Sequence, residues 1–119
     1  MKKQSIYYTD AKGRNPVWEF LQKLSPDEKE KCYEYIHLLE ESGEESRRPV
    51  SDYLEQKIYE LRPKQNRILY FFMYRDYVVL VHAFRKKSQA VPQREIEIAV
   101  KRMNQFVLRY QLGPIRLGD

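Results

Sequence analysis

The stretch that decides the fold runs from Lys57 to Arg102 and reads KIYELRPKQNRILYFFMYRDYVVLVHAFRKKSQAVPQREIEIAVKR. Runs of β-branched and aromatic residues alternate with short turns that contain Pro, Asn or Asp, and this pattern predicts consecutive strands. The last two runs are almost continuously hydrophobic, so they are expected to lie centrally in the sheet. The three predicted strands are Lys57–Arg62, Arg67–Tyr74 and Tyr77–Phe84.

Helices are expected on both sides of these strands. Downstream, apolar residues recur at helical spacing from Pro92 to about Tyr110. Upstream, Asn15-Pro16 and Ser25-Pro26 each combine an N-cap residue with a proline suited to the first helical turn. The second upstream helix is expected to end at Gly43. Because the break between the two upstream helices is very short, they are expected to form a hairpin.

The remaining segments complete the predicted domain. Ser5–Thr9 is a short candidate strand, residues 44–56 are expected to form a connecting loop, and residues 113–119 a frayed tail. Trp18 is expected in the core. The element order β-α-α-β-β-β-α predicts a single α+β domain over residues 1–119, in which an antiparallel sheet is flanked by an N-terminal helical hairpin and a C-terminal helix.

Positive charge is concentrated in the second half of the chain. The net charge is +5, but residues 1–56 carry nine Lys or Arg and twelve Asp or Glu, whereas residues 57–119 carry thirteen and five. A basic half on one small domain is typical of a protein that binds nucleic acid or another polyanion. The alternative is an ordinary solvated surface on a basic protein.

Several classes of protein are disfavoured by composition. Cys32 is the only cysteine, so an internal disulfide and a cysteine-rich metal site are excluded. No apolar run approaches the roughly 20 residues that a membrane-spanning helix needs, and Lys2 and Lys3 are not followed by the apolar run of a signal peptide. A cytoplasmic protein without metal or cofactor is therefore expected.

The turns predict which side chains share a face of the sheet. If residues 63–66 form a four-residue turn, Arg62 lies opposite Arg67. If Arg75-Asp76 forms a two-residue turn, Tyr74 pairs with Tyr77. By the same count Leu69 faces His82 and Arg67 faces Phe84. Alternation then places one set of residues on a common face, which Lys86 would continue: Glu60, Arg62, Arg67, Leu69, His82 and Phe84.

This face has a chemistry of its own. Two arginines opposite each other repel, which favours an anionic partner such as phosphate over a merely solvated turn. Lys86 and Lys87 add charge at the same end, with edge solubility as the alternative. An ion pair is favoured for Glu60 over a role as general base, and a hydrogen-bonded core position is favoured for His82 over catalysis.

An ordered set of motifs resembles the RelE/HigB-type toxins of bacterial type II toxin–antitoxin systems, most closely the phage-derived HigB-like subgroup. The resemblance covers nearly the whole chain, although no single motif decides it. It implies a RelE/ParE-like fold similar to that of a compact microbial ribonuclease. The motifs are Pro16-Val-Trp-Glu-Phe-Leu21, Tyr59-Glu-Leu-Arg62, Arg67-Ile-Leu-Tyr70, Val81-His-Ala-Phe84, Lys86-Lys-Ser-Gln89, Pro92 and Glu95-Ile-Glu-Ile-Ala99.

The resemblance also implies a function. Such toxins are mostly ribosome-dependent mRNA endonucleases, which cleave in the ribosomal A site by attack of a ribose 2′-hydroxyl, leave a 2′,3′-cyclic phosphate without using a metal, and inhibit translation. A helix-turn-helix antitoxin, HigA-like, is the implied partner. The implied catalytic positions are Arg67, Arg62 and Lys86, with His82 as a further candidate. The candidate RNA-binding residues are Lys87, Lys64, Gln89 and Tyr70.

Two departures from the family pattern leave the proton-transfer groups unassigned. Glu60 stands where RelE has a lysine, and the tyrosine that RelE uses after its last strand has no clear counterpart here, Gln89 being the nearest residue. Two alternative functions therefore stay open: a ParE-like toxin that inhibits DNA gyrase, and a catalytically inactive RNA-binding relative.

Overall fold

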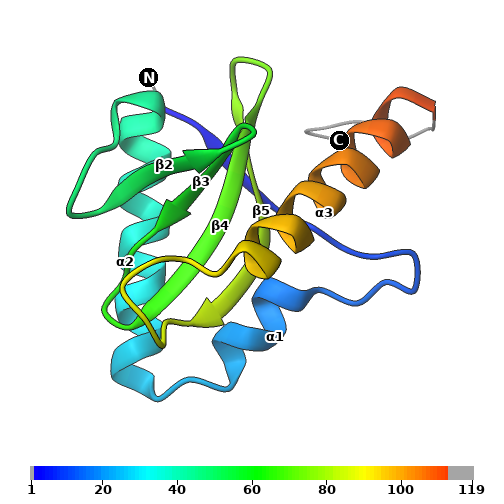
Figure 1. Ribbon diagram of the computed structural model, residues 1–119. Coiled ribbons are helices and arrows are strands. Elements are labelled where there is room, and N and C mark those ends of the chain that lie inside the picture. The colour runs from blue at the N-terminus through cyan, green and yellow to red at the C-terminus, as the bar shows by residue number, and fades with distance from the viewer. Residues whose placement is uncertain (1, 113–119) are drawn as a thin grey trace.

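A computed structural model describes residues 2–112, so the predicted frayed tail at 113–119 lies outside the described residues. It shows a five-stranded sheet with helices on both faces (Figure 1), which confirms the α+β class. The strands are β1 Gln4–Tyr7, β2 Ser51–Glu55, β3 Ile58–Leu61, β4 Asn66–Met73 and β5 Tyr77–Arg85. The helices are α1 Pro16–Gln22, α2 Pro26–Ser42 and α3 Gln93–Leu112, with a short 3-10 turn, η1, at Gly43–Glu45.

The sheet differs from the predicted one in two places. Its strand order is β1-β5-β4-β3-β2, so the hydrophobic strands β4 and β5 lie inside it as expected. The predicted loop at residues 44–56 is wrong where Ser51–Glu55 forms the edge strand β2. An edge strand pairs on one side only and can therefore be short and polar. The sequence of β2, SDYLE, is of this kind and gives little indication of a strand. β1 pairs with β5 in parallel, so the sheet is mixed rather than wholly antiparallel.

Two irregularities in the β4–β5 hairpin cancel each other. Tyr74 does not pair with Tyr77 as predicted; Met73 does, because the connecting loop holds three residues, 74–76. A β-bulge at Val81 then takes up the extra residue. The predicted pairs Leu69 with His82 and Arg67 with Phe84 are therefore confirmed. One face of the sheet thus carries Glu60, Arg67, Leu69, His82 and Phe84 as predicted, whereas Arg62 and Lys86 lie just beyond the strand ends.

Helices cover the two faces of the sheet separately (Figure 1). α1 and α2 enclose one core, which contains Cys32, and α3 covers the other, which contains Leu69. Both predicted N-caps are confirmed: Asn15 accepts from an α1 amide at 3.1 Å and Ser25 from an α2 amide at 3.3 Å. The core position expected for Trp18 is wrong, because its side chain is 50% exposed.

Between residues 2 and 112, no helix combines the length and the apolar character needed to cross a membrane.

Candidate functional site

A buried carboxylate lies between two arginines at one end of the sheet. Glu60 on β3 is 3% exposed, and its Oε2 lies 2.7 Å from Nη1 of Arg62. Its Oε1 lies 3.3 Å from Nε of Arg67, the second residue of β4. The pairing between β3 and β4 brings these side chains together on the face that α3 covers. The ion pair favoured for Glu60 is thereby confirmed, and this closed cluster consists of Glu60, Arg62 and Arg67.

Arg67 is held from several directions. Its Nη1 donates to the carbonyl oxygens of Lys64 at 2.9 Å and Asn66 at 2.8 Å. Burial lowers the pKa of Arg67, and the nearby charges of Arg62 and Arg48 act in the same direction while Glu60 opposes them. With only 4% of the residue exposed, this guanidinium fixes the β3–β4 turn, and little of it faces solvent.

Three lysines, of which Lys64 and Lys87 are exposed and Lys86 is half-buried, lie at this end. Lys64 lies exposed in the β3–β4 turn, and the Lys86 amide donates to the Gln65 carbonyl at 2.7 Å, which brings the segment after β5 against that turn. Lys87 follows and is exposed, as is Gln89. Within residues 2–112 none of the three lysines forms an ion pair. We call Lys64, Lys86 and Lys87 the lysine edge.

Tyr70 lies on the other face of the sheet, away from the lysine edge. It is 1% exposed and stacks on Tyr59 with ring centroids 5.4 Å apart. Burial raises the pKa of its hydroxyl, followed by smaller effects of neighbouring groups. The ring belongs to the core under α1 and α2, so it offers no surface on which a base can stack.

A second polar cluster ties α3 to β5. Nε2 of His82 lies 2.7 Å from Oε1 of Glu95, and its Nδ1 lies 3.2 Å from Nη1 of Arg102. That arginine nitrogen also donates to the Val81 carbonyl at 2.9 Å. Because a guanidinium has only donors, Nδ1 of His82 is the acceptor and Nε2 carries the hydrogen that Glu95 accepts. We call Glu95, His82 and Arg102 the open cluster.

His82 is held as a neutral ring. Burial lowers its pKa, the hydrogen bond that His82 donates to Glu95 opposes this effect, and the charge of Arg102 adds to it. Both ring nitrogens are engaged, and 13% of the side chain is exposed. His82 therefore has no free nitrogen to present to a substrate in this arrangement.

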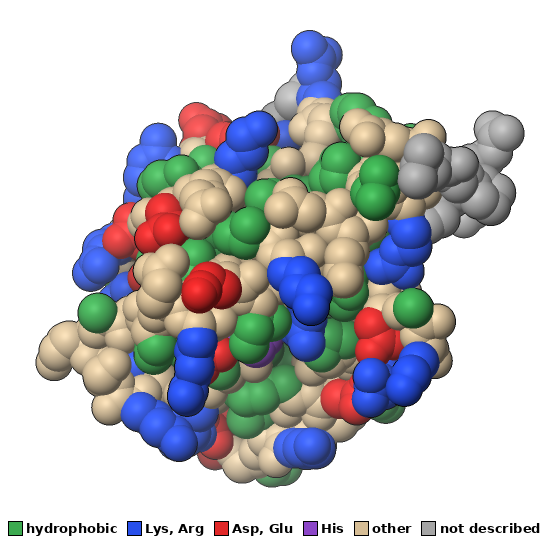
Figure 2. All heavy atoms as spheres, turned by 45° about the vertical axis from the view of Figure 1, so that its right-hand side comes forward, with side chains coloured by type: hydrophobic (Ala, Val, Ile, Leu, Met, Phe, Trp, Pro, Cys, Tyr) green, Lys and Arg blue, Asp and Glu red, His purple; other side chains and the backbone are tan. Residues whose placement is uncertain are grey.

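A hollow of about 360 Å³ borders the open cluster. Phe84, Lys87 and Glu95 line it, so it connects one member of the lysine edge with one member of the open cluster. Arg85 at the end of β5, Pro92 just before α3 and Arg94 in its first turn complete the lining. On the side of the molecule shown in Figure 2, Lys and Arg side chains are spread around patches of hydrophobic surface.

Sequence reasoning missed Glu95 and Arg102 as members of the site. Their spacing of seven residues places them on the same side of a helix, two turns apart. Together with a histidine inside an apolar strand, that spacing was the available signal. The spacing does not show that α3 docks on β5, because that contact is visible only in the tertiary structure.

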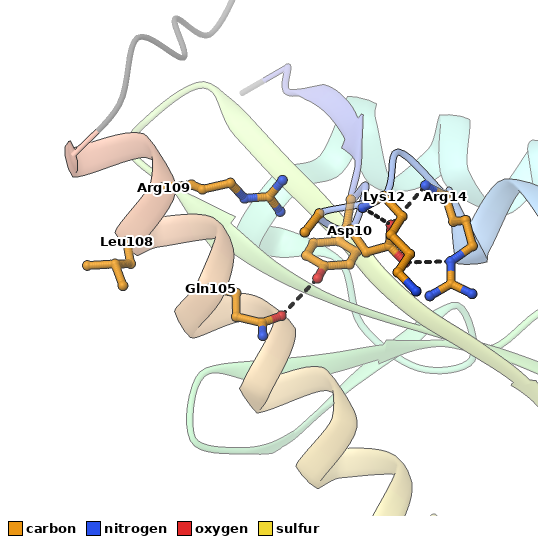
Figure 3. A pocket seen from close by; sticks show the side chains of 8 residues that line it. Asp10, Lys12, Arg14, Gln105, Leu108 and Arg109 are labelled. Atoms are coloured by element: carbon orange, nitrogen blue, oxygen red, sulfur yellow. Dashed lines mark hydrogen bonds and ion pairs between the residues drawn. The ribbon is translucent and has the colours of Figure 1, made fainter.

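A larger hollow of about 530 Å³ lies between α3 and the connection from β1 to α1. In Figure 3, Gln105 and Arg109 point from α3 toward this connection, while Leu108 points away. The Tyr8 hydroxyl donates to Gln105 at 2.9 Å, and Asp10 is paired with an arginine of its own loop at 2.9 Å. None of the residues singled out from the sequence lines this hollow.

Between residues 2 and 112, no group of three His, Cys, Asp or Glu side chains is placed to hold a metal ion.

No curated protein matches the chain. The model of one family, described as Phage derived protein Gp49-like (DUF891), matches residues 19–104. The match starts in α1, includes strands β2 to β5 and reaches the middle of α3, so it contains the closed cluster, the lysine edge and the open cluster. The chain belongs to the Gp49-like family of phage-derived proteins.

Proposed function

We propose that the protein is the toxin of a type II toxin–antitoxin pair, and that it inhibits translation by cleaving mRNA in the ribosomal A site. Two findings support this function: membership of the Gp49-like family and the resemblance of the motifs to RelE/HigB-type toxins. The observation that carries it is the lysine edge, where unpaired cations from two separate segments meet beside a hollow that also presents a carboxylate.

The proposed reaction needs positive charge more than it needs a metal. When a ribose 2′-hydroxyl attacks the adjacent phosphate, negative charge grows on the phosphate oxygens, and fixed cations stabilise it. Glu60 already neutralises much of the charge of Arg67, so the lysine edge is expected to hold the phosphates. Arg62, whose side chain is 21% exposed, can contribute the outward part of its guanidinium.

The proposal also predicts a partner. A helix-turn-helix antitoxin is expected to cover the lysine edge, and to be acidic where it does so, because unpaired lysines attract negative charge.

The test is to map mRNA 5′ ends in cells shortly after expression begins. We compare the unchanged protein with the double variant K86A/K87A. The matched control is K57A/R75A, which removes the same charge at the opposite end of the sheet, where β3 begins and β4 ends. New ends at codon boundaries are expected for the unchanged protein and the control, and a loss of at least about tenfold for the lysine-edge variant.

Each other outcome identifies a different function. Unchanged mRNA ends together with growth arrest and a DNA damage response would replace the proposal with the gyrase-inhibiting function. Unchanged ends with normal growth, and RNA binding that weakens with salt, would indicate an inactive relative. Equal cleavage by both double variants would remove the lysine edge from the mechanism.

A further inference from the structure

We infer that Glu95 is the general base of the cleavage reaction, with His82 and Arg102 as the residues that position its carboxylate. This inference rests on the proposed endonuclease function. It assigns the proton-transfer role that the sequence left open, with Glu60 and His82 as disfavoured candidates, and it does so from the geometry of the open cluster.

The two oxygens of Glu95 have different surroundings. Oε1 accepts the hydrogen on Nε2 of His82 at 2.7 Å. Oε2 has no hydrogen-bond partner among the described residues, and Nε of Arg94 lies 3.7 Å from it, beyond hydrogen-bonding distance. Glu95 also lines the 360 Å³ hollow. Oε1 is therefore fixed by a hydrogen bond, whereas Oε2 has only the longer contact with the exposed Arg94 and keeps its capacity to accept a proton.

Arg102 decides which hydrogen bond the histidine can make. Its guanidinium donates to Nδ1 of His82 and to the Val81 carbonyl, so it is anchored on the strand and on the ring at once. Since Nδ1 must accept, Nε2 must donate, and the imidazole can only point a hydrogen at Glu95. Such a fixed donor orients the carboxylate, as outer partners do for other reactive side chains.

The hollow has the complementary features for a nucleotide. Lys87, which forms no ion pair within residues 2–112, lines the hollow together with Glu95, and this suits a phosphate next to the reacting hydroxyl. The Phe84 ring, stacked on His82 with centroids 5.6 Å apart, provides an aromatic surface for an unpaired base. A ribose between these two contacts would occupy the hollow that Glu95 lines.

The chemical step conserves every atom and charge. The 2′-hydroxyl gives its proton to Oε2 of Glu95 while its oxygen forms a bond to the adjacent phosphorus. The bond from phosphorus to the 5′-oxygen of the next nucleotide breaks, and that oxygen leaves with the bonding pair and takes a proton from water. Glu95 returns its proton to the solvent. The products are a 2′,3′-cyclic phosphate and a 5′-hydroxyl end.

A purely structural role for the same contacts makes different predictions. In that case Glu95 would only fasten the first turn of α3 to β5 and complement the helix dipole. The variant E95Q separates the two roles, because its amide oxygen still accepts from His82 while its amide nitrogen cannot take up a proton.

The experiment measures single-turnover cleavage of a defined mRNA on purified ribosomes. E95Q is compared with the unchanged protein and with E97Q, which removes an exposed charge two residues further along the same helix. We expect E95Q to lose at least about a hundredfold in rate, as is typical for removal of a general base, and E97Q to stay within threefold. Binding to ribosomes whose mRNA carries a 2′-deoxy ribose at the cleavage site should be unchanged for both variants.

A second variant guards against loss of folding. E95D keeps a carboxylate on a shorter side chain, so it should cleave at least about tenfold faster than E95Q. Near-normal cleavage by E95Q, or equal rates for E95Q and E95D, would overturn the assignment while leaving the endonuclease function intact. If the unchanged protein cleaves nothing, the proposed function fails first and the assignment of Glu95 fails with it.

Discussion

Two carboxylates, Glu60 on β3 and Glu95 in the first turn of α3, differ in what surrounds them. Glu60 is enclosed by Arg62 and Arg67 and is almost fully buried. Glu95 is fixed by His82 on one side and faces a hollow on the other. The first cluster joins neighbouring strands within the sheet, whereas the second joins a helix to the sheet at a surface opening.

This difference shows that residue type alone does not locate the chemistry. From the sequence, the arginines are the expected phosphate ligands. In the structure, however, Arg67 donates hydrogen bonds to backbone carbonyls of the β3–β4 turn. Exposure separates the roles: the closed cluster is expected to govern stability, and the open cluster with the lysine edge is expected to govern activity. Each of the following changes tests that separation.

The largest effect on stability is expected for Glu60→Gln. The neutral amide leaves Arg67 buried without its counter-charge, and removal of one partner from a buried ion pair costs about 3–5 kcal/mol. Because Arg62 is partly exposed and can turn toward solvent, we expect a value near the lower end, about 3 kcal/mol in the free energy of unfolding. Urea unfolding measures it, with Glu97→Gln as a control that stays within about 0.5 kcal/mol. A loss below about 1 kcal/mol would contradict a structural role for the closed cluster.

Arg67→Lys is expected to have the next largest effect. The ammonium keeps the positive charge but loses the fork that reaches the Lys64 and Asn66 carbonyls, which lowers the free energy of unfolding by about 2 kcal/mol. Cleavage measured well below the unfolding temperature should remain within a few fold of normal. Full stability combined with lost cleavage would instead identify Arg67 as a direct phosphate ligand.

The open cluster is expected to make stability depend on pH. Burial holds the pKa of His82 below its usual value of 6.5 in the folded protein. As the pH falls below 6.5, His82 becomes protonated in the unfolded chain but stays neutral in the folded protein. The free energy of unfolding therefore decreases until the pH reaches the lower pKa of the folded state. Glu95 and Arg102 are the charged groups that face the ring, so they help to set the difference between the folded and unfolded pKa of His82.

Unfolding curves at a series of pH values measure this dependence. In His82→Gln the decrease below pH 6.5 should shrink, whereas His37→Gln, which changes an exposed histidine on α2, should leave it in place. An unchanged slope in the His82 variant would show that other groups cause the acid sensitivity.

Much of the fold could be read from the sequence because its signals are local. Hydrophobic runs, cap residues and turn residues predicted β4, β5 and all three helices to within a few positions. The strand β2 gave no such signal because an edge strand depends on its neighbour β3 more than on its own composition. The bulge at Val81 was equally invisible, and the register at Arg67 was right because the longer turn compensated for it.

The site was only half predictable for a related reason. The lysine edge follows from charges placed next to turns, which the sequence shows directly. The burial of Arg67 and the contact between Glu95 and His82 depend on how strands pair and where α3 docks, so they follow from tertiary structure. Tyr70 shows the same limit: alternation places it on the face under α1 and α2, but a tyrosine suits either a buried or a binding surface.

The smallest expected effect concerns the lysine edge and is measured as a salt dependence. Each lysine that contacts a phosphate of a single strand contributes about 0.7 to the slope of log affinity against log salt concentration. Lys86→Ala should therefore lower the slope for a non-cleavable 2′-deoxy oligonucleotide by about that amount, without changing the free energy of unfolding. Lys57→Ala, at the opposite end of the sheet, should leave the slope unchanged. If both variants lowered it equally, the RNA would be bound by diffuse positive charge, and the distinction between a closed cluster for stability and an exposed edge for binding would lose its basis.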